Sequence, residues 1–203
     1  AQAKALFQEV AHTNMLPFIQ RLDYYSHHFL GRPYQLGALG EGMDGRFDQS
    51  PNYRFDCFDC LTYVNTVLAL VLSNTSCDFK KNLAKLNYYN GEPRYLKRFH
   101  FMSADWNAEN QATGLLQDIT RDILDRENQP FFINAKTTID RPAWFRRRGM
   151  GDIKLVTPIR KGEAQQLLAD LHEIANEVNV TEATIDYLPI ANLFTDKGVA
   201  VQS

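Results

Sequence analysis

Two cysteines stand directly before the most apolar helical stretch of the chain. They are Cys57 and Cys60, within the segment YRFDCFDCLTYVNTVLALVLSN at residues 53–74. The apolar residues after Cys60 recur at steps of three and four, which predicts a helix with one face in the core. Cys60 is therefore expected at a helix N-terminus, where unpaired N–H groups and the helix dipole favour an anion such as a reactive thiolate. The alternative is that both cysteines are small buried apolar residues, as free cysteines often are. The apolar positions are Leu61, Val64, Val67, Leu68 and Val71.

The spacing of the cysteines also admits redox or metal chemistry. Cys57 and Cys60 form a C-x-x-C, the pattern of thioredoxin-like pairs and of half a zinc site. No second C-x-x-C completes a zinc ribbon, and Phe-Asp is an unlikely insert for a redox pair. His27 and His28 do not easily share one metal ion, because neighbouring helical residues point about 100° apart. The sequence therefore favours a reactive thiol over a metal site.

The composition is that of a globular chain with nearly balanced charge. Among 203 residues, 22 Lys and Arg stand against 24 Asp and Glu, so the net charge of −2 provides no basic field to attract nucleic acid. Hydrophobic residues make up 44%, which is typical of a packed core. No apolar run approaches the roughly 18 residues that a membrane span needs. The start at Ala1-Gln2-Ala3, without Met, leads us to expect an exported, mature protein.

Periodicity predicts helices and strands on both sides of the cysteine-bearing helix. Residues 31–52 are rich in Gly and turn formers and predict a long loop. The alternation in residues 94–103 predicts a strand that carries Arg98 and His100 on one face. The other predicted strands are 115–120, 153–157 and 183–188, and the other predicted helices are 3–12, 16–30, 163–178 and, as a shorter helix or a helix-to-strand passage, 77–89.

The predicted strands indicate a group that could orient His100. If residues 94–103 and 115–120 pair as a hairpin, Asp118 lies on the same face as His100. A cysteine hydrolase needs a thiolate that attacks, an imidazole that protonates the leaving amine, and a group that holds the imidazole. Cys60, His100 and Asp118 supply these parts in that order, with Asp105 and Asn110 as alternatives for the third.

Three short motifs carry a resemblance to a known family. Residues 31–37 read GRPYQLG, residues 58–62 read FDCLT, and residues 98–101 read RFHF and are followed by Asp105-Trp106. The first two resemble the G-x-P-Y-x-x-G and F-D-C-S/T signature of NlpC-type papain-like cell-wall cysteine hydrolases. The run DCLTYV, with RFHF and the following DW, is similar to the N-acetylmuramoyl-L-alanine amidase-like branch of that superfamily. The resemblance covers about residues 30–120.

The resemblance implies a role for each matching residue. Cys60 would be the nucleophile and His100 the general base, while the Tyr34 hydroxyl would stand near an oxyanion hole beside the backbone N–H of Cys60. Asp118 is the first choice for the third catalytic position. The triplet Phe-Asp-Cys also occurs three residues earlier, but only Cys60 is followed by Thr and the long apolar helix. Cys57 is therefore the lesser candidate.

The resemblance also implies a substrate. Family members act on bacterial peptidoglycan stems and muropeptides, and this branch would hydrolyse the amide between the lactyl group of N-acetylmuramic acid and L-alanine, with no cofactor and no metal. Arg98 either binds a stem carboxylate, which a guanidinium suits, or forms a surface ion pair. Asp59, Asp105 and Trp106 are further candidates for substrate binding. The alternative functions are an endopeptidase between D-glutamate and the diamino acid, and a catalytically inactive cell-wall binding module.

The implied fold is α+β with a papain-like NlpC-type core. A central antiparallel sheet would pack on the helix that carries the nucleophile, with added helices in both terminal parts. Residues 1–203 would form one domain, with an N-terminal helical part at 1–30, the catalytic core at 31–125 and the completion of the sheet and helix layer at 126–203. The substrate and the chain start together predict the periplasm or cell envelope.

Overall fold

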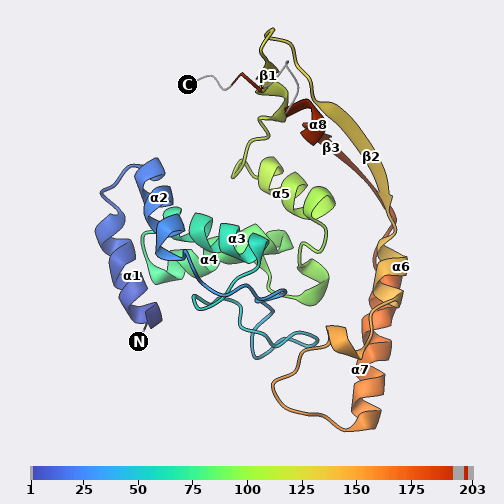
Figure 1. Ribbon diagram of the computed structural model, residues 1–203. Helices are drawn as coiled ribbons and strands as arrows, with labels where there is room; N and C mark the ends of the chain where they lie inside the picture. Colours follow the sequence, from blue (N-terminus) through green and yellow to red (C-terminus); the bar gives the residue numbers. More distant parts are fainter. Residues whose placement is uncertain (1, 194–198, 201–203) are drawn as a thin grey trace. The chain divides into compact units, whose positions relative to one another are not determined.

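The chain forms two units, each assembled from two separate stretches of sequence. The computed structural model describes residues 2–193 and 199–200 (Figure 1). Ala1–Phe99 and Arg147–Ile174 belong to the first unit, and His100–Arg146 and Ala175–Ser203 to the second. The single domain expected from the sequence stays a prediction.

The first unit is built around the predicted cysteine-bearing helix. This helix, α3, runs over Cys60–Val71 and packs against α2 (Phe18–His28) and α4 (Ser76–Asn87). The chain reaches it through α1 (Gln2–Thr13) and the long loop, and α7 (Lys161–Glu173) comes from the second stretch of the unit. These helices confirm the predictions at 3–12, 16–30 and 77–89. The predicted helix at 163–178 is confirmed as far as Glu173, where α7 ends. The 3₁₀ helices of this unit are η1 Tyr89–Gly91, η2 Tyr95–Lys97 and η5 Met150–Asp152; η4 Thr120–Asp122 belongs to the second unit, and η6 Ile174–Asn176 begins at the last residue of the first.

Aromatic side chains on both sides of the cysteine segment anchor it to the core. The Phe55 and Phe58 side chains are buried, and each packs on Phe29 with ring centroids 5.9 and 5.0 Å apart. Burying one such side chain contributes about 1.5–3 kcal/mol. The segment that leads into α3 is therefore held on the core by two residues that flank Cys57.

The buried face of α3 is rotated from the one that the apolar spacing predicts. Val67 and Val71 are buried, but Val64 is 39% exposed, while Asn65 and Thr66 are fully buried. The polar pair is accommodated because the Asn65 amide donates to the Asn87 side-chain oxygen at 2.8 Å and the Thr66 hydroxyl donates to the Thr62 carbonyl at 2.7 Å.

The second unit combines short helices with small antiparallel sheets. The strands β2 (Ile133–Ile139) and β3 (Thr181–Tyr187) pair so that Ile133 faces Tyr187 and Ile139 faces Thr181. This confirms the predicted strand at 183–188, and the mixture of helix and small antiparallel sheet confirms the α+β class. The remaining elements are the π-helix η3 Met102–Trp106, α5 Asn107–Ala112, β1 Leu124–Asp125, α6 Arg141–Arg146, α8 Ile190–Leu193 and β4 Val199–Ala200, which pairs with β1.

Three predicted strands are wrong. Residues 94–103 alternate in polarity, yet they form the turn η2, a single bridge from Arg98 to Tyr88, and the start of η3. Residues 115–120 offer no partner strand, because the N–H groups of 115 and 116 turn back to the Asn110 carbonyl. Residues 153–157 contribute only one bridge, from Lys154 to Asp48. The hairpin expected around residue 110 is therefore absent, and α5 occupies that place.

Within the first unit α3 packs on helices, not on the predicted central sheet. No helix in the described residues is long and apolar enough to cross a membrane.

Candidate active site

Cys60 is the first residue of α3, and the helix start around it is tightly capped. The Asp59 carboxylate accepts the Thr62 N–H at 2.8 Å, and the Thr62 hydroxyl accepts the Asp59 N–H at 2.8 Å. This capping box satisfies two of the four N–H groups that a helix start leaves unpaired. Among the described residues, the N–H groups of Cys60 and Leu61 donate to nothing. The exposed Cys60 thiol thus stands beside two unused donors.

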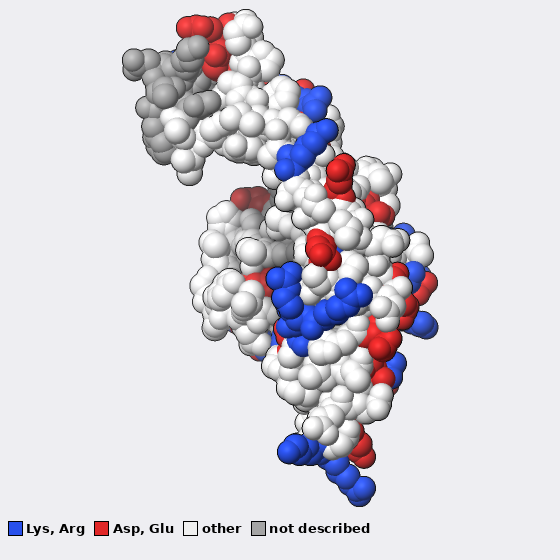
Figure 2. Space-filling model, turned by 90° about the vertical axis from the view of Figure 1, so that its right-hand side faces the viewer, with Lys and Arg blue, Asp and Glu red and all other residues white. Residues whose placement is uncertain are grey.

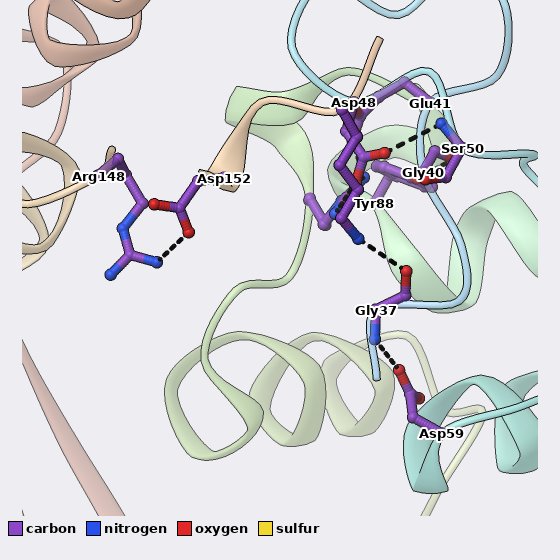
Figure 3. A network of polar contacts seen from close by, with 11 residues as sticks. Gly37, Gly40, Glu41, Asp48, Ser50, Asp59, Tyr88, Arg148 and Asp152 are labelled. Carbon is purple, nitrogen blue, oxygen red and sulfur yellow. Dashed lines mark hydrogen bonds and ion pairs between the residues drawn. The ribbon is translucent and has the colours of Figure 1, made fainter. Parts of the chain in front are cut away.

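Asp59 also fastens the Gly-rich loop to the start of α3. Its second carboxylate oxygen accepts the Gly37 N–H at 3.0 Å, as Figure 3 shows. Gly37 has φ +63°, and a Cβ there would lie 2.7 Å from the Lys154 ammonium, which itself donates to the Gly37 carbonyl at 2.9 Å. Only glycine fits this position without strain. Both oxygens of Asp59 thus make internal contacts, and the substrate-binding role suggested from the sequence stays a prediction.

Tyr34 lies beside the segment that precedes Cys60. The backbones on either side of it pair with Phe58, because the Phe58 N–H donates to the Pro33 carbonyl at 3.1 Å and the Gln35 N–H donates to the Phe58 carbonyl at 2.9 Å. The Tyr34 side chain is 70% exposed. The structure thus brings together the G-x-P-Y and F-D-C motifs.

Cys57 has the opposite environment to Cys60. Its side chain is buried, and its thiol donates to the Gln35 side-chain oxygen at 3.1 Å. Burial raises the pKa of the Cys57 thiol, and the nearby Arg54 only partly offsets this. A thiol that resists ionisation is a poor nucleophile, so the structure distinguishes two cysteines that follow identical Phe-Asp pairs.

Arg98 holds a second part of the Gly-rich loop, around Glu41 and Asp48. Its guanidinium pairs with Asp48 at 3.1 Å and with Glu41, and both carboxylates are almost fully buried. Desolvation raises the pKa of Glu41 to about 7 despite the attraction of Arg98. Neither Glu41 oxygen receives a well-directed hydrogen bond. Arg98 thus forms an ion pair within the protein, but the pair is buried and not on the surface, where the sequence analysis expected it.

His100 is the first residue of the second unit, and Cys60 belongs to the first. The imidazole lies among aromatic rings, with centroid distances of 4.8 Å to Trp144 and 5.6 Å to Phe145. His100 lies outside any strand. The pairing of Cys60 with His100 stays a prediction.

Asp105 holds the backbone immediately after His100. One of its oxygens accepts the Phe101 N–H at 2.9 Å, and the other accepts from Arg141. The Arg141 guanidinium lies 5.1 Å from the centre of the Phe101 ring and donates to the Thr181 hydroxyl at 3.0 Å. Asp105 is completely buried. These contacts give no support to substrate binding by Asp105. They show instead that Asp105 restrains the backbone next to His100.

The two remaining candidates line a cavity of about 540 Å³ in the second unit. Asp118 and Trp106 both contribute to its wall. Asp118 accepts the Thr120 N–H at 2.8 Å, and its expected place beside His100 is lost together with the hairpin. Asn110, the other alternative for the third position, is buried and donates to the Trp106 carbonyl at 2.8 Å.

A family model described as AmiA-like, N-acetylmuramoyl-L-alanine amidase-like, matches residues 24–202. The chain belongs to this family. A crystal structure of a Legionella pneumophila str. Philadelphia 1 protein, described by the family model DUF1460, is 36% identical with a TM-score of 0.91. The match covers 97% of this chain and 66% of that one.

An N-acetylmuramoyl-L-alanine amidase from Bacteroides uniformis ATCC 8492 is 21% identical with a TM-score of 0.55, over 85% of this chain and 65% of the other. This second likeness concerns the fold alone. The AmiA-like chain therefore spans slightly less than two thirds of each of these structures. A search of curated proteins finds no match.

Sequence reasoning missed the residues that hold the two loops of this AmiA-like chain. Glu41 and Asp48 pair with Arg98 from the loop predicted at residues 31–52. Arg141 and Trp144 reach Asp105 and the His100 ring from a stretch about 40 residues further on. No local sequence pattern predicts contacts between residues so far apart in the chain. Figure 2 shows acidic and basic side chains interspersed on the face it draws, in keeping with the balanced composition.

Proposed function

We propose that the chain is a cysteine amidase that hydrolyses the N-acetylmuramoyl–L-alanine bond of peptidoglycan fragments. The family match supports an amidase-class activity. The observation that carries the cysteine mechanism is the exposure of Cys60 at the start of α3, while its sequence copy Cys57 is buried and hydrogen-bonded. The motifs at 31–37 and 58–62 support a relation to NlpC-type papain-like enzymes.

In the proposed reaction the Cys60 thiolate attacks the lactyl carbonyl carbon. The N–H groups of Cys60 and Leu61, with the exposed Tyr34 hydroxyl, are suited to stabilise the oxyanion that forms. The His100 imidazolium then gives its proton to the alanine nitrogen, and the C–N bond breaks. Water, deprotonated by His100, hydrolyses the thioester to a free lactyl carboxylate and regenerates the thiol.

We assign the third role to Asp105 rather than to Asp118. Asp105 was an alternative in the sequence, and it binds the N–H of the residue that follows His100. Its role is positioning, since the contacts found are to the backbone of Phe101 and to Arg141. The Trp144 ring beside His100 restricts the imidazole further.

The substrate sets the proposed location. Muropeptides arise from the bacterial wall, so we propose that the chain acts in the periplasm or cell envelope. An enzyme assembled at Cys60 needs neither metal nor cofactor, because a thiolate and an imidazole supply both the nucleophile and the proton.

The test compares Cys60→Ala with its matched control Cys57→Ala on a purified disaccharide-peptide muropeptide. Cys60→Ala should lower the rate of amide hydrolysis by about 10³-fold or more, whereas Cys57→Ala should keep most of it. Mass spectrometry of the products identifies the bond: an amidase releases the whole stem with L-alanine at its N-terminus, and an endopeptidase leaves L-Ala-D-Glu on the sugar. Equal activity of wild type and Cys60→Ala would exclude the cysteine mechanism.

A further inference from the structure

The Gly-rich loop contains a buried carboxylate that the proposed chemistry at Cys60 does not use. Only 2% of the Glu41 side chain is exposed, and neither of its oxygens receives a well-directed hydrogen bond. Among the described residues, its ion-pair partner is Arg98. A buried carboxylate without directed hydrogen bonds holds a proton more readily than an exposed one, because ionisation would leave a poorly solvated charge.

The groups that face Glu41 come from three segments of the first unit. Asp48, on the returning arm of the loop, shares Arg98 with Glu41, and its negative charge disfavours the ionised form of Glu41. Tyr88, directly after α4, and Tyr95, in η2, also interact with its charge. Burial raises the pKa of both phenols to about 12, so they stay neutral around pH 7. The pKa of about 7 means that Glu41 itself changes charge in that range.

The same cluster joins the two arms of the loop. The Glu41 N–H donates to the Asp48 carbonyl at 2.9 Å, and the Tyr88 hydroxyl donates to the Gly40 carbonyl at 3.0 Å; Figure 3 shows these residues gathered together. A Cβ on Gly40 would collide with the Asp48 carboxylate, so the arms approach as closely as a glycine allows. Separation of the arms would therefore expose Glu41 to water.

A series of contacts leads from Asp48 to the helix start at Cys60. The backbone of Lys154 lies along the returning arm, where it donates to and accepts from the residues on either side of Asp48, at 2.8 and 2.6 Å. The Lys154 ammonium holds the Gly37 carbonyl at 2.9 Å, and the Gly37 N–H donates to Asp59. Movement of the arm around Asp48 would thus withdraw Lys154 from Gly37.

We propose that Glu41 is a positioning residue for the site at Cys60, and that loss of its proton loosens the Gly-rich loop and slows catalysis. The loop carries Tyr34, three residues before Gly37. The closed loop binds the proton more tightly than an open loop, in which Glu41 meets water. Closure is therefore fully favoured below the ordinary pKa of a glutamate and weakens as the pH rises through about 7. The effect on catalysis rests on the proposed function, whereas the loosening does not.

Hydrogen exchange tests the loosening without any hydrolysis. The N–H groups of residues 35, 37, 40, 41 and 42 are hydrogen-bonded in the closed loop. Their protection is measured in the full chain by mass spectrometry at pH 6 and pH 8, corrected for the intrinsic effect of pH on exchange. Relative to Glu41→Gln, wild type should lose about tenfold in protection between these pH values.

Two comparisons show that this change is local and specific. In wild type at pH 8 the loop should exchange faster than α3, because the loop opens while the helix stays folded. Asp44→Asn removes an exposed carboxylate of the same loop and should behave as wild type. If Glu41→Gln does not fold, wild type alone decides: its corrected loop protection should fall from about pH 5 and level off above about pH 7.5.

Turnover of a muropeptide tests the effect on catalysis. The kcat of wild type, divided by that of Glu41→Gln, should fall by up to about tenfold from pH 6 to pH 8. Groups that titrate in both proteins cancel in this ratio. A constant ratio would overturn the positioning role. Equal protection of the loop in the two proteins at both pH values, or exchange of the loop together with α3, would overturn the loosening.

The two proposals can fail separately. Loss of loop protection with rising pH in a chain that hydrolyses no muropeptide would refute the proposed function alone. Muropeptide hydrolysis whose pH profile is the same in wild type and Glu41→Gln would refute the role of Glu41 alone.

Discussion

Two buried carboxylates, each next to an arginine, are held in different ways. In the second unit, each oxygen of Asp105 receives a hydrogen bond, one from the Phe101 N–H and one from Arg141. In the first unit, Glu41 lies against Arg98 but neither of its oxygens receives a directed hydrogen bond, and Arg98 also serves Asp48. Both carboxylates are almost completely removed from water.

The comparison shows that burial and a nearby arginine do not by themselves keep a carboxylate charged. Desolvation outweighs Arg98 and raises the pKa of Glu41 to about 7, with the charge of Asp48 adding to the shift. Directed hydrogen bonds to both oxygens favour the ionised form of a buried carboxylate. We therefore expect Glu41 to be an anchor that responds to pH.

The largest expected difference is between Asp105→Asn and Glu41→Gln. Asp105→Asn removes the charge that faces a largely buried Arg141. It also places an amide NH₂ against one of the two hydrogen-bond donors, the Phe101 N–H or Arg141. The variant should therefore lose about 3 kcal/mol or more of unfolding free energy. Glu41→Gln resembles the protonated group and should cost less than about 1 kcal/mol at neutral pH. Urea denaturation of both variants measures the two costs.

An exposed carboxylate of the second unit provides the control for this pair. Asp122→Asn should stay within about 0.5 kcal/mol of wild type. If Asp105 positions His100, Asp105→Asn should also lower kcat and leave KM nearly unchanged, measured at temperatures where the variant is fully folded. Equal losses of unfolding free energy in Asp105→Asn and Glu41→Gln would mean that the directed hydrogen bonds of Asp105 do not make it more important for stability than Glu41.

The second prediction concerns the pH dependence of stability that Glu41 creates. Its pKa is about 7 in the folded chain and near the ordinary 4.5 in the unfolded chain, so the folded state holds the proton more tightly. The contribution is fully favourable below the ordinary pKa and is lost as the pH rises through about 7. Between about pH 5 and pH 8, wild type should lose on the order of 2 kcal/mol relative to Glu41→Gln.

Denaturation of both proteins across that range measures this loss as a difference, which cancels the titration of other groups. Parallel stability curves for the two proteins would show that Glu41 titrates in its ordinary range and would refute this prediction.

In the first unit, the features that depend on residues close together in the sequence could be predicted from the sequence. The helix at Cys60 follows from apolar spacing and from Asp59 and Thr62, whose capping box lies within four residues. The preference for Cys60 over Cys57 follows from the same local signals. The rotation of the buried face of α3 did not follow, because it depends on Asn87, a partner on another helix.

The predictions failed in both units where residues distant in the sequence decide the backbone conformation. The alternation in 94–103 has the period of a strand, but a strand also needs a partner, and residues 115–120 supply none. The Phe101 N–H is instead taken by Asp105, four residues later in a π-turn, and Asp105 is held by Arg141. Periodicity registers neither contact, and so Asp118 was preferred over Asp105.

The smallest expected effect separates the two duties of Asp59, the local counterpart of Asp105. Asp59→Ala removes the N-cap of α3 and should cost about 1–2 kcal/mol. Asp59→Ser retains a capping oxygen for the Thr62 N–H, but its shorter side chain cannot also reach the Gly37 N–H. Its stability should therefore lie within about 0.5 kcal/mol of wild type, while the loop that carries Tyr34 loses one tie to α3.

Activity on a muropeptide then shows whether that tie matters. If the loop aligns Tyr34 with the Cys60 N–H, Asp59→Ser should lose about tenfold in kcat at nearly normal stability, because a donor displaced from the oxyanion loses much of its effect. Thr75→Ser, a conservative change at the N-cap of α4, controls for a general effect of altered caps. Full activity in Asp59→Ser would mean that Asp59 stabilises only the start of α3. The hydrogen bond from Asp59 to the Gly37 N–H would then contribute nothing to catalysis, unlike the contacts by which Asp105 holds the segment after His100.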